Sequence, residues 1–153
     1  MEGESMIRIQ EGDLLECDLQ ILAHQVNCRG SFGAGLAGQM AEKWPALRAS
    51  YQRFVKDHSP EELLGGIYVW EGLGVTVVNL FGQDEPGPNT DVSALYTSIQ
   101  ALNDYMALEG FETVGLPWGI GCGIGGADWK EVRKMVESQF SGTERHLVWV
   151  KRD

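Results

Sequence analysis

The 153-residue chain has 12 Lys and Arg against 22 Asp and Glu, so its formal net charge is −10. Hydrophobic residues make up 43% of it and charged residues 22%, which is typical of a globular domain and not of a disordered chain. The acidic balance disfavours general binding to nucleic-acid backbones and anionic membranes. We expect one domain spanning residues 1–153, with residues 1–5 as an N-terminal extension.

The apolar runs at 21–26 and 74–81 fall well short of the about 20 residues needed for a transmembrane helix. The first six residues include two glutamates and lack the basic and apolar regions of a secretory signal, so a cytoplasmic location is expected. Cys17, Cys28 and Cys122 are far apart and lack the paired spacing of a zinc site. We expect reduced thiols, no bound metal and no cofactor.

Hydrophobic periodicity predicts strands before helices in the first half of the chain. Pro45 suits the first turn of a helix, and the nearly all-apolar run at 75–81 indicates a central strand. The short link 71–74 fits an antiparallel hairpin or another tight connection within one sheet. The expected elements are strands at 6–10 and 20–26, helices at 35–43 and 45–57, and strands at 66–70 and 75–81.

The second half alternates helices and strands. Thr90 or Asp91 can cap a helix whose apolar residues keep helical spacing up to a stop at Gly110. A strand at 113–116, a helix with an apolar face at 129–140 and a last strand at 146–151 follow. This alternation predicts an α/β fold with a mainly parallel sheet, whose ligand lies beyond the carboxyl ends of the strands.

Two glycine-rich loops, 27–37 and 117–126, each follow a predicted strand and lead into a helix. Glycines there let backbone amides approach an anion, and a helix N-terminus adds partial positive charge, so the pair suits two linked phosphates. Glycines that only form tight turns are the alternative. The chain lacks the lysine-containing phosphate loop of nucleotide hydrolases, and its glycine spacing and context do not fit a dinucleotide-binding dehydrogenase.

Three motifs in this order resemble those of a macrodomain: Glu11-Gly12-Asp13-Leu14-Leu15, the stretch from His24 to Ala37, and the stretch from Leu116 to Gly126. Within that family the chain is most similar to the ADP-ribose-1''-phosphate phosphatase branch. The resemblance covers nearly the whole chain. It implies a three-layer α/β/α fold with a mixed, mainly parallel sheet, and a cleft for ADP-ribose or a 1''-substituted ADP-ribose.

The resemblance also assigns ligand contacts. Asp13 would accept a hydrogen bond from the adenine amino group beside the amide of Leu14, although Asp13 could instead cap a turn. Asn27 would meet the distal ribose, and Phe81 would wall that ribose unless it is a core aromatic. Trp149 could cover adenine or be buried. The two loops would hold the diphosphate with Gly33, Ala34, Gly35 and Leu36, and with Gly119, Ile120, Gly121, Cys122, Gly123, Ile124 and Gly125.

Candidate catalytic residues are His24, Asn27 and Asp128. His24 matches a histidine of the phosphatase branch and could act as acid or base, or be a hydrogen-bonded structural histidine. If the strand stays regular, the odd separation places it on the opposite strand face from Asn27. Asp128 could act as acid or base, or cap the following helix.

Two positions depart from the relatives that remove ADP-ribose from glutamate or DNA. Where those enzymes have a lysine after the central strand, this chain has Gln83, and where the glutamate enzymes have a loop aspartate it has Gly125. Covalent lysine catalysis is therefore not expected. The leading hypothesis is hydrolysis of ADP-ribose-1''-phosphate. The alternatives are a non-catalytic ADP-ribose reader, an O-acetyl-ADP-ribose deacetylase or another ADP-ribosyl hydrolase.

Overall fold

A computed structural model describes residues 6–152, and the predicted N-terminal extension, residues 1–5, lies outside the described residues. Six strands form one sheet in the order β1-β6-β5-β2-β4-β3. All neighbouring strands run parallel except β3 and β4, which form an antiparallel hairpin. The strands are β1 (Ile7–Glu11), β2 (Ile21–Asn27), β3 (Ile67–Gly72), β4 (Val75–Gln83), β5 (Thr113–Pro117) and β6 (His146–Lys151).

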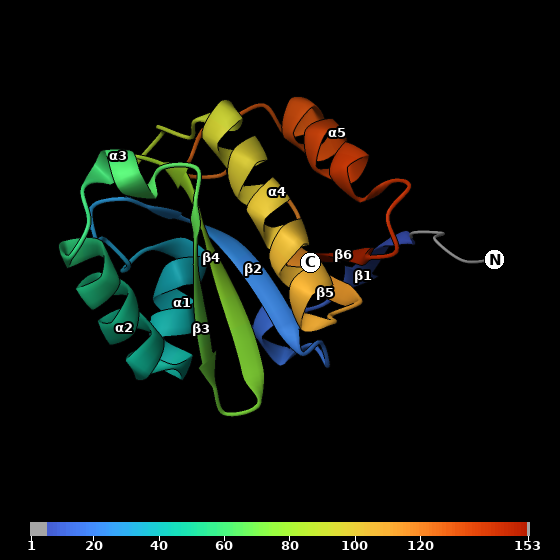
Figure 1. Cartoon of the computed structure of the whole chain (residues 1–153), viewed down its shortest axis with the longest axis horizontal. Coiled ribbons are helices and arrows are strands. Elements are labelled where there is room, and N and C mark those ends of the chain that lie inside the picture. Colours follow the sequence, from blue (N-terminus) through green and yellow to red (C-terminus); the bar gives the residue numbers. More distant parts are fainter. Residues whose placement is uncertain (1–5, 153) are drawn as a thin grey trace.

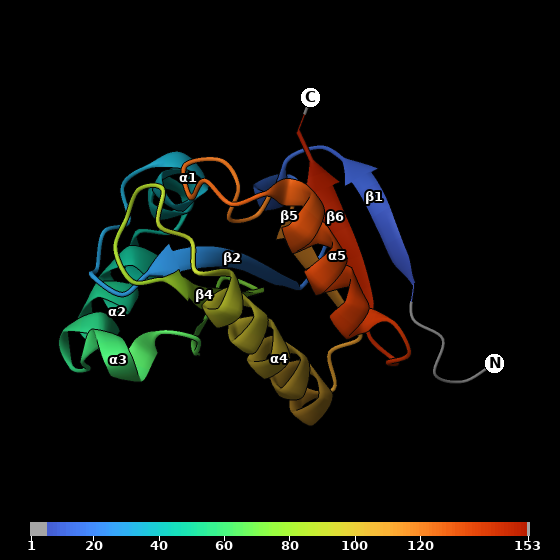
Figure 2. The same ribbon diagram turned by 90° about the horizontal axis from the view of Figure 1, so that it is seen from above.

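Helices cover both faces of the sheet (Figures 1 and 2). One face carries α1 (Gly35–Lys43), α2 (Pro45–Lys56) and α3 (Pro60–Leu63), together with the 3₁₀ helix η1 (Leu14–Glu16). The other face carries α4 (Val92–Glu109) and α5 (Trp129–Phe140). Each face has its own buried apolar cluster, which confirms the predicted three-layer α/β/α fold with a mixed, mainly parallel sheet. Across residues 6–152, no helix combines the length and the apolar character that a membrane span requires.

Most predicted elements are confirmed to within two residues, and local chemistry explains their ends. The carboxylate of Asp91 caps α4 by accepting from the amide of Ala94, and Gly110 ends that helix in the left-handed region at φ 79°. The sequence interpretation missed η1 and α3. The latter begins with a capping box, in which the Ser59 and Glu62 side chains accept from each other's backbone amides.

The parallel strands β2, β4 and β5 direct their carboxyl ends to one edge of the sheet, where the two glycine-rich loops meet the loop after β4. Residues from these three connections line one cavity, which lies at the edge of the sheet where the sequence predicts the ligand.

Candidate ligand-binding site

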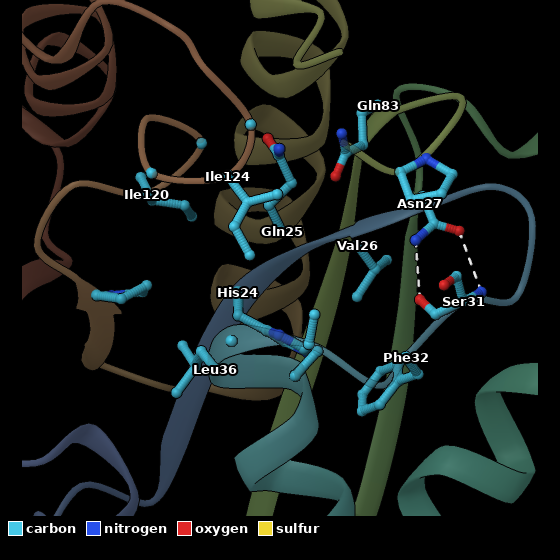
Figure 3. A pocket seen from close by; sticks show the side chains of 18 of the residues that line it. His24, Gln25, Val26, Asn27, Ser31, Phe32, Leu36, Gln83, Ile120 and Ile124 are labelled. Carbon is cyan, nitrogen blue, oxygen red and sulfur yellow. Dashed lines mark hydrogen bonds between the residues drawn. The ribbon is translucent and has the colours of Figure 1, made fainter. Parts of the chain in front are cut away.

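The larger cavity of the structure has a volume of about 380 Å³ and lies between the two glycine-rich loops. In Figure 3, Ile120 and Ile124 of the second loop lie on one side of β2, and Asn27 and Ser31 of the first loop lie on the other. A cavity of this size is typical of small-molecule sites. Its lining combines glycine backbone with uncharged polar groups, namely His24, Gln25, Asn27, Ser31 and Gln83.

Asn27 ends β2 and organises the first loop with its own side chain. Its Oδ1 accepts from the amide of Arg29 at 2.9 Å and from that of Ser31 at 3.3 Å, and its Nδ2 donates to the Ser31 carbonyl at 2.8 Å. The Tyr51 hydroxyl donates to the backbone carbonyl of Asn27. The Asn27 side chain lines the cavity. Its amide also has hydrogen-bond partners within the protein, through which it holds the first loop in shape.

His24 and Asn27 do not face opposite ways, because the strand does not stay regular up to Asn27. The regular pairing of β2 with β4 shifts between Val26 and Asn27, so the alternation of side chains does not extend to Asn27. Phe32 connects the two residues on one side of the sheet, since its ring packs edge-on against His24 and also contacts Tyr51, which contacts Asn27. Both His24 and Asn27 therefore line the same cavity.

His24 is 2% exposed and is held by the Asn79 side chain, with 2.7 Å between its Nε2 and Oδ1 of Asn79. Because Asn79 Nδ2 donates to the carbonyl of Tyr68, Oδ1 is left as acceptor, and we assign the imidazole proton to Nε2. Burial lowers the pKa of His24 to about 4. The ring is therefore neutral at pH 7, and its Nδ1 is a hydrogen-bond acceptor.

This burial makes stability depend on pH. An unfolded histidine has a pKa near 6.5, so the unfolded chain takes up a proton as pH falls below that value, while folded His24 stays neutral until about pH 4. The stabilising contribution is complete above pH 6.5 and is lost on acidification towards pH 4. Urea unfolding should show that the wild type loses about 2 kcal/mol more than His24→Gln between pH 7 and pH 5. Equal losses in the two proteins would contradict a buried, neutral His24.

The second glycine-rich loop lies against the loop after β4. A Cβ atom on Gly125 would lie 2.1 Å from Oγ1 of Thr90 and 2.5 Å from the carbonyl oxygen of Gly121, so the loop has no room for a side chain there. Gly123 differs, because a Cβ at that position would meet no atom within 4 Å. The loop therefore presents backbone to the cavity at Gly123, as a phosphate site needs.

Gln83 and the residues after it close the cavity at the end of β4. Gln83 lines the cavity and donates from Nε2 to the carbonyl of Gly87 at 3.0 Å. Next to it, Asp84 pairs with Arg29 of the first loop at 3.0 Å, and its carbonyl accepts from the amide of Cys28. Both charged side chains are nearly half exposed, so the ion pair contributes little to the free energy of folding. It nevertheless joins the first glycine-rich loop to the loop after β4.

A second cavity of about 330 Å³ adjoins the first, and the two share Gly35, Leu36, Pro117 and Trp118 as lining residues. It contains Asp13 and Leu14, the residues predicted to meet adenine. Asp13 also caps η1, since Oδ1 accepts from the amide of Leu15 at 3.0 Å. The capping role and the predicted binding role are compatible, because a carboxylate has further acceptor sites.

Three candidate site residues, Phe81, Cys122 and Asp128, need correction, and the structure decides between the two alternatives left open for Trp149. Phe81 is fully buried and stacks with Tyr51 and Phe54, so it does not line either cavity. Cys122, predicted to hold the diphosphate, lines neither cavity, because its thiol donates to the Ile120 carbonyl. Burial raises the pKa of this thiol to about 11.

Asp128 is outside both cavities and caps α5 by accepting from the amide of Lys130 at 3.3 Å. Trp149, considered as a cover for adenine, is fully buried and donates from Nε1 to Glu137 at 2.7 Å. Within residues 6–152, no group of three or more His, Cys, Asp or Glu side chains is placed to hold a metal ion.

Sequence reasoning missed several lining residues. Trp118 borders both cavities directly after β5, and its position beside a glycine-rich loop was an available signal. Gln25 is a polar residue within a largely buried strand, which often indicates a buried polar partner. The other missed lining residues are Val26, Ser31, Phe32, Ala37, Pro86, Gly87 and Pro117 in the larger cavity, and Gln39, Pro117, Val150, Lys151 and Arg152 in the smaller one.

Curated proteins similar to this chain come from a phage, from mycobacteria and from yeasts. An uncharacterized 17.5 kDa protein of Enterobacteria phage T4 is 27% identical over 150 residues, which cover 94% of this chain and 96% of that protein. The DNA ADP-ribosyl glycohydrolase of Mycobacterium tuberculosis is 25% identical over 139 residues, 88% of this chain but 39% of that enzyme. An ADP-ribose 1''-phosphate phosphatase of Meyerozyma guilliermondii is 43% identical, over 51 residues that cover 32% of this chain and 29% of that protein. The similarity to the phosphatase thus covers a shorter part of this chain than the similarity to the glycohydrolase. It does not establish that the chain belongs to the phosphatase branch.

Solved structures share the fold. The macrodomain of Mycobacterium tuberculosis DarG has a TM-score of 0.84 at 24% identity, with 96% of this chain and 97% of that chain covered. Thermosipho africanus DarTG, solved in complex with ADP-ribose, has a TM-score of 0.81 at 19% identity, with 95% of this chain and 42% of that chain covered. The Macro domain family model matches residues 23–136, which include most of β2, both glycine-rich loops and most of α5. With these residues matched, the chain belongs to the Macro domain family.

Proposed function

We propose that this chain binds ADP-ribose across the two adjoining cavities and hydrolyses the phosphate ester of ADP-ribose-1''-phosphate. One observation supports the binding proposal. The two glycine-rich loops face one cavity, and this cavity continues into a second cavity that contains Asp13. Adenine would occupy the Asp13 cavity, the diphosphate would lie between the loops, and the distal ribose would lie against Asn27. A relative of the same fold was solved in complex with ADP-ribose, which supports ADP-ribose as the ligand.

For the reaction, water would attack the phosphorus atom, the bond to the ribose oxygen would break, and ADP-ribose and inorganic phosphate would leave. His24 is the only titratable side chain among the described residues that line the larger cavity. Its neutral Nδ1 could accept a hydrogen bond from the attacking water, while Asn27 and the loop amides would position the substrate. The yeast phosphatase resemblance supports this choice of ester.

Turnover tests the proposal. Purified wild-type protein should release phosphate from ADP-ribose-1''-phosphate, and His24→Gln should lose roughly 100-fold in rate while still binding ADP-ribose. Asp128→Ala is the matched control, because that carboxylate caps α5 outside the cavities and its loss should not change the rate. Wild-type protein that binds ADP-ribose but releases neither phosphate nor the acetyl group of O-acetyl-ADP-ribose would contradict the hydrolase.

A non-catalytic ADP-ribose reader is the second candidate. Among the described residues, the larger cavity is lined by no Asp, Glu, Lys or Arg, and its one histidine has a pKa of about 4. Such a lining is better suited to binding than to strong acid–base catalysis. The same phosphate-release assay separates the two candidates, because the reader predicts tight binding and no turnover.

Asn27→Ala should weaken both the ligand complex and the fold. The substitution removes the amide proposed to meet the distal ribose, with an expected loss of roughly 1 to 3 kcal/mol in binding free energy. It also leaves the amides of Arg29 and Ser31 without their acceptor, so the melting temperature should fall. Calorimetry with ADP-ribose and with AMP measures the effect. AMP lacks the distal ribose, so its affinity should fall less, and an equal loss for both ligands would contradict the assignment.

A further inference from the structure

Three separate segments of the chain meet at Thr90, which lies between the loop after β4 and the start of α4. Its Oγ1 accepts from Nε2 of Gln25 on β2 at 2.7 Å and donates to the carbonyl of Gly121 at 2.9 Å. Its backbone amide donates to the carbonyl of Gly125 at 3.1 Å. Thr90 therefore holds the second glycine-rich loop at two points, and Gln25 holds Thr90.

The loop approaches these side chains as closely as glycine allows. A Cβ on Gly121 would lie 3.2 Å from Oε1 of Gln25 and 3.3 Å from Cγ2 of Thr90, and a Cβ on Gly125 would collide with Oγ1 of Thr90. The loop is thus fitted around the threonine hydroxyl. In Figure 3, the amide of Gln25 reaches up from β2 towards this loop.

One atom of the Gln25 side chain is in an energetically unfavourable environment. Its Oε1 is buried and has no hydrogen-bond partner among the described residues, although an unpaired buried acceptor is unfavourable. Such an atom in a native structure calls for an explanation. The other half of the same amide supplies one, because Nε2 makes the short hydrogen bond to Thr90.

We propose that Thr90, held by Gln25, is a positioning residue that fixes the second glycine-rich loop in a ligand-binding shape before the ligand arrives. This inference rests on the proposed binding of ADP-ribose. The smaller cavity is bordered by the first loop and by Pro117 and Trp118 at the start of the second loop, but by no residue of 119–125. An adenosine monophosphate there need not touch the part of the second loop that Thr90 holds. A preorganised second loop would then favour ligands with a diphosphate over those with a single phosphate.

Thr90→Val removes the hydroxyl while keeping the β-branched shape, and Thr90→Ser keeps the hydroxyl. By calorimetry, Thr90→Val should weaken ADP-ribose binding at least about tenfold and change AMP affinity by no more than about twofold. Thr90→Ser should stay within about threefold of wild type for both ligands. Unchanged ADP-ribose affinity in Thr90→Val, equal losses for the two ligands, or a serine variant as weak as the valine variant would each overturn the proposal.

A ligand-free measurement separates this inference from the proposed function. Amide hydrogen exchange over residues 120–126 should be faster in Thr90→Val than in wild type and Thr90→Ser, with all three proteins folded by circular dichroism. If the wild type does not bind ADP-ribose, the proposed function fails while the exchange comparison still tests the role of Thr90. Equal exchange in the three proteins would show that Thr90 does not hold the loop.

Discussion

Gly123→Glu is expected to abolish ADP-ribose binding and leave the fold intact. Gly123 lines the larger cavity, and the space around a Cβ there is open, so a glutamate side chain enters the cavity without displacing other residues. Its charge would lie where the loop amides are proposed to face a phosphate. Like charges about 4 Å apart at an effective dielectric of 20 repel by about 4 kcal/mol, which corresponds to about a 1000-fold loss of affinity.

Gly123→Gln is the matched control for size, because glutamine fills the same space without charge. We expect calorimetry to show a smaller loss for glutamine than for glutamate, and thermal unfolding to show little change in either variant. Wild-type affinity in a folded Gly123→Glu protein would show that the second loop is a turn and not a phosphate site.

The sequence predicted the fold well where local chemistry decides the structure. The bounds of α1, α5 and β6 match the predicted ranges. Gly35 and Pro45 mark the limits of α1, Asp128 caps the start of α5, and β6 follows from its apolar run. The position of the cavity also followed from the sequence, since parallel strands direct the loops that follow them to one edge. Both predictions depend only on residues that are close together in the sequence.

The errors concern side chains whose direction depends on distant contacts. The strand β4 is buried along nearly its whole length and is covered on both faces, so no alternation indicated whether Phe81 points to the cavity or into the core. The orientation of Asn27 depends on a register shift against β4, and the role of Thr90 depends on a hydrogen bond to Gln25, which is 65 residues away. Such pairings are set by tertiary packing, which periodicity within one segment does not report.

The similarity to DNA ADP-ribosyl glycohydrolases makes the departures at Gln83 and Gly125 informative. Gln83 lies at the cavity, and the family resemblance predicts that it stands where those relatives have a lysine. Gly125 is pressed against Thr90 and Gly121, so an aspartate there would require the loop and the Thr90 contact to rearrange. The predicted differences from these relatives therefore involve the packing of the second glycine-rich loop as well as the residue types at positions 83 and 125.

We accordingly expect the protein not to release ADP-ribose from modified DNA or from modified glutamate. An amide is not a nucleophile that can attack C1'' of an opened ribose, so the covalent lysine route is closed at Gln83. The measurement is release of ADP-ribose from a modified single-stranded oligonucleotide and from a glutamate-modified protein, with a DNA ADP-ribosyl glycohydrolase as the positive control. Protein from the same preparation must bind ADP-ribose, so that inactivity cannot come from an empty or misfolded site. Efficient release from either substrate would mean that another nucleophile or an activated water acts in this cavity, and that Gln83 does not occupy the place of the lysine.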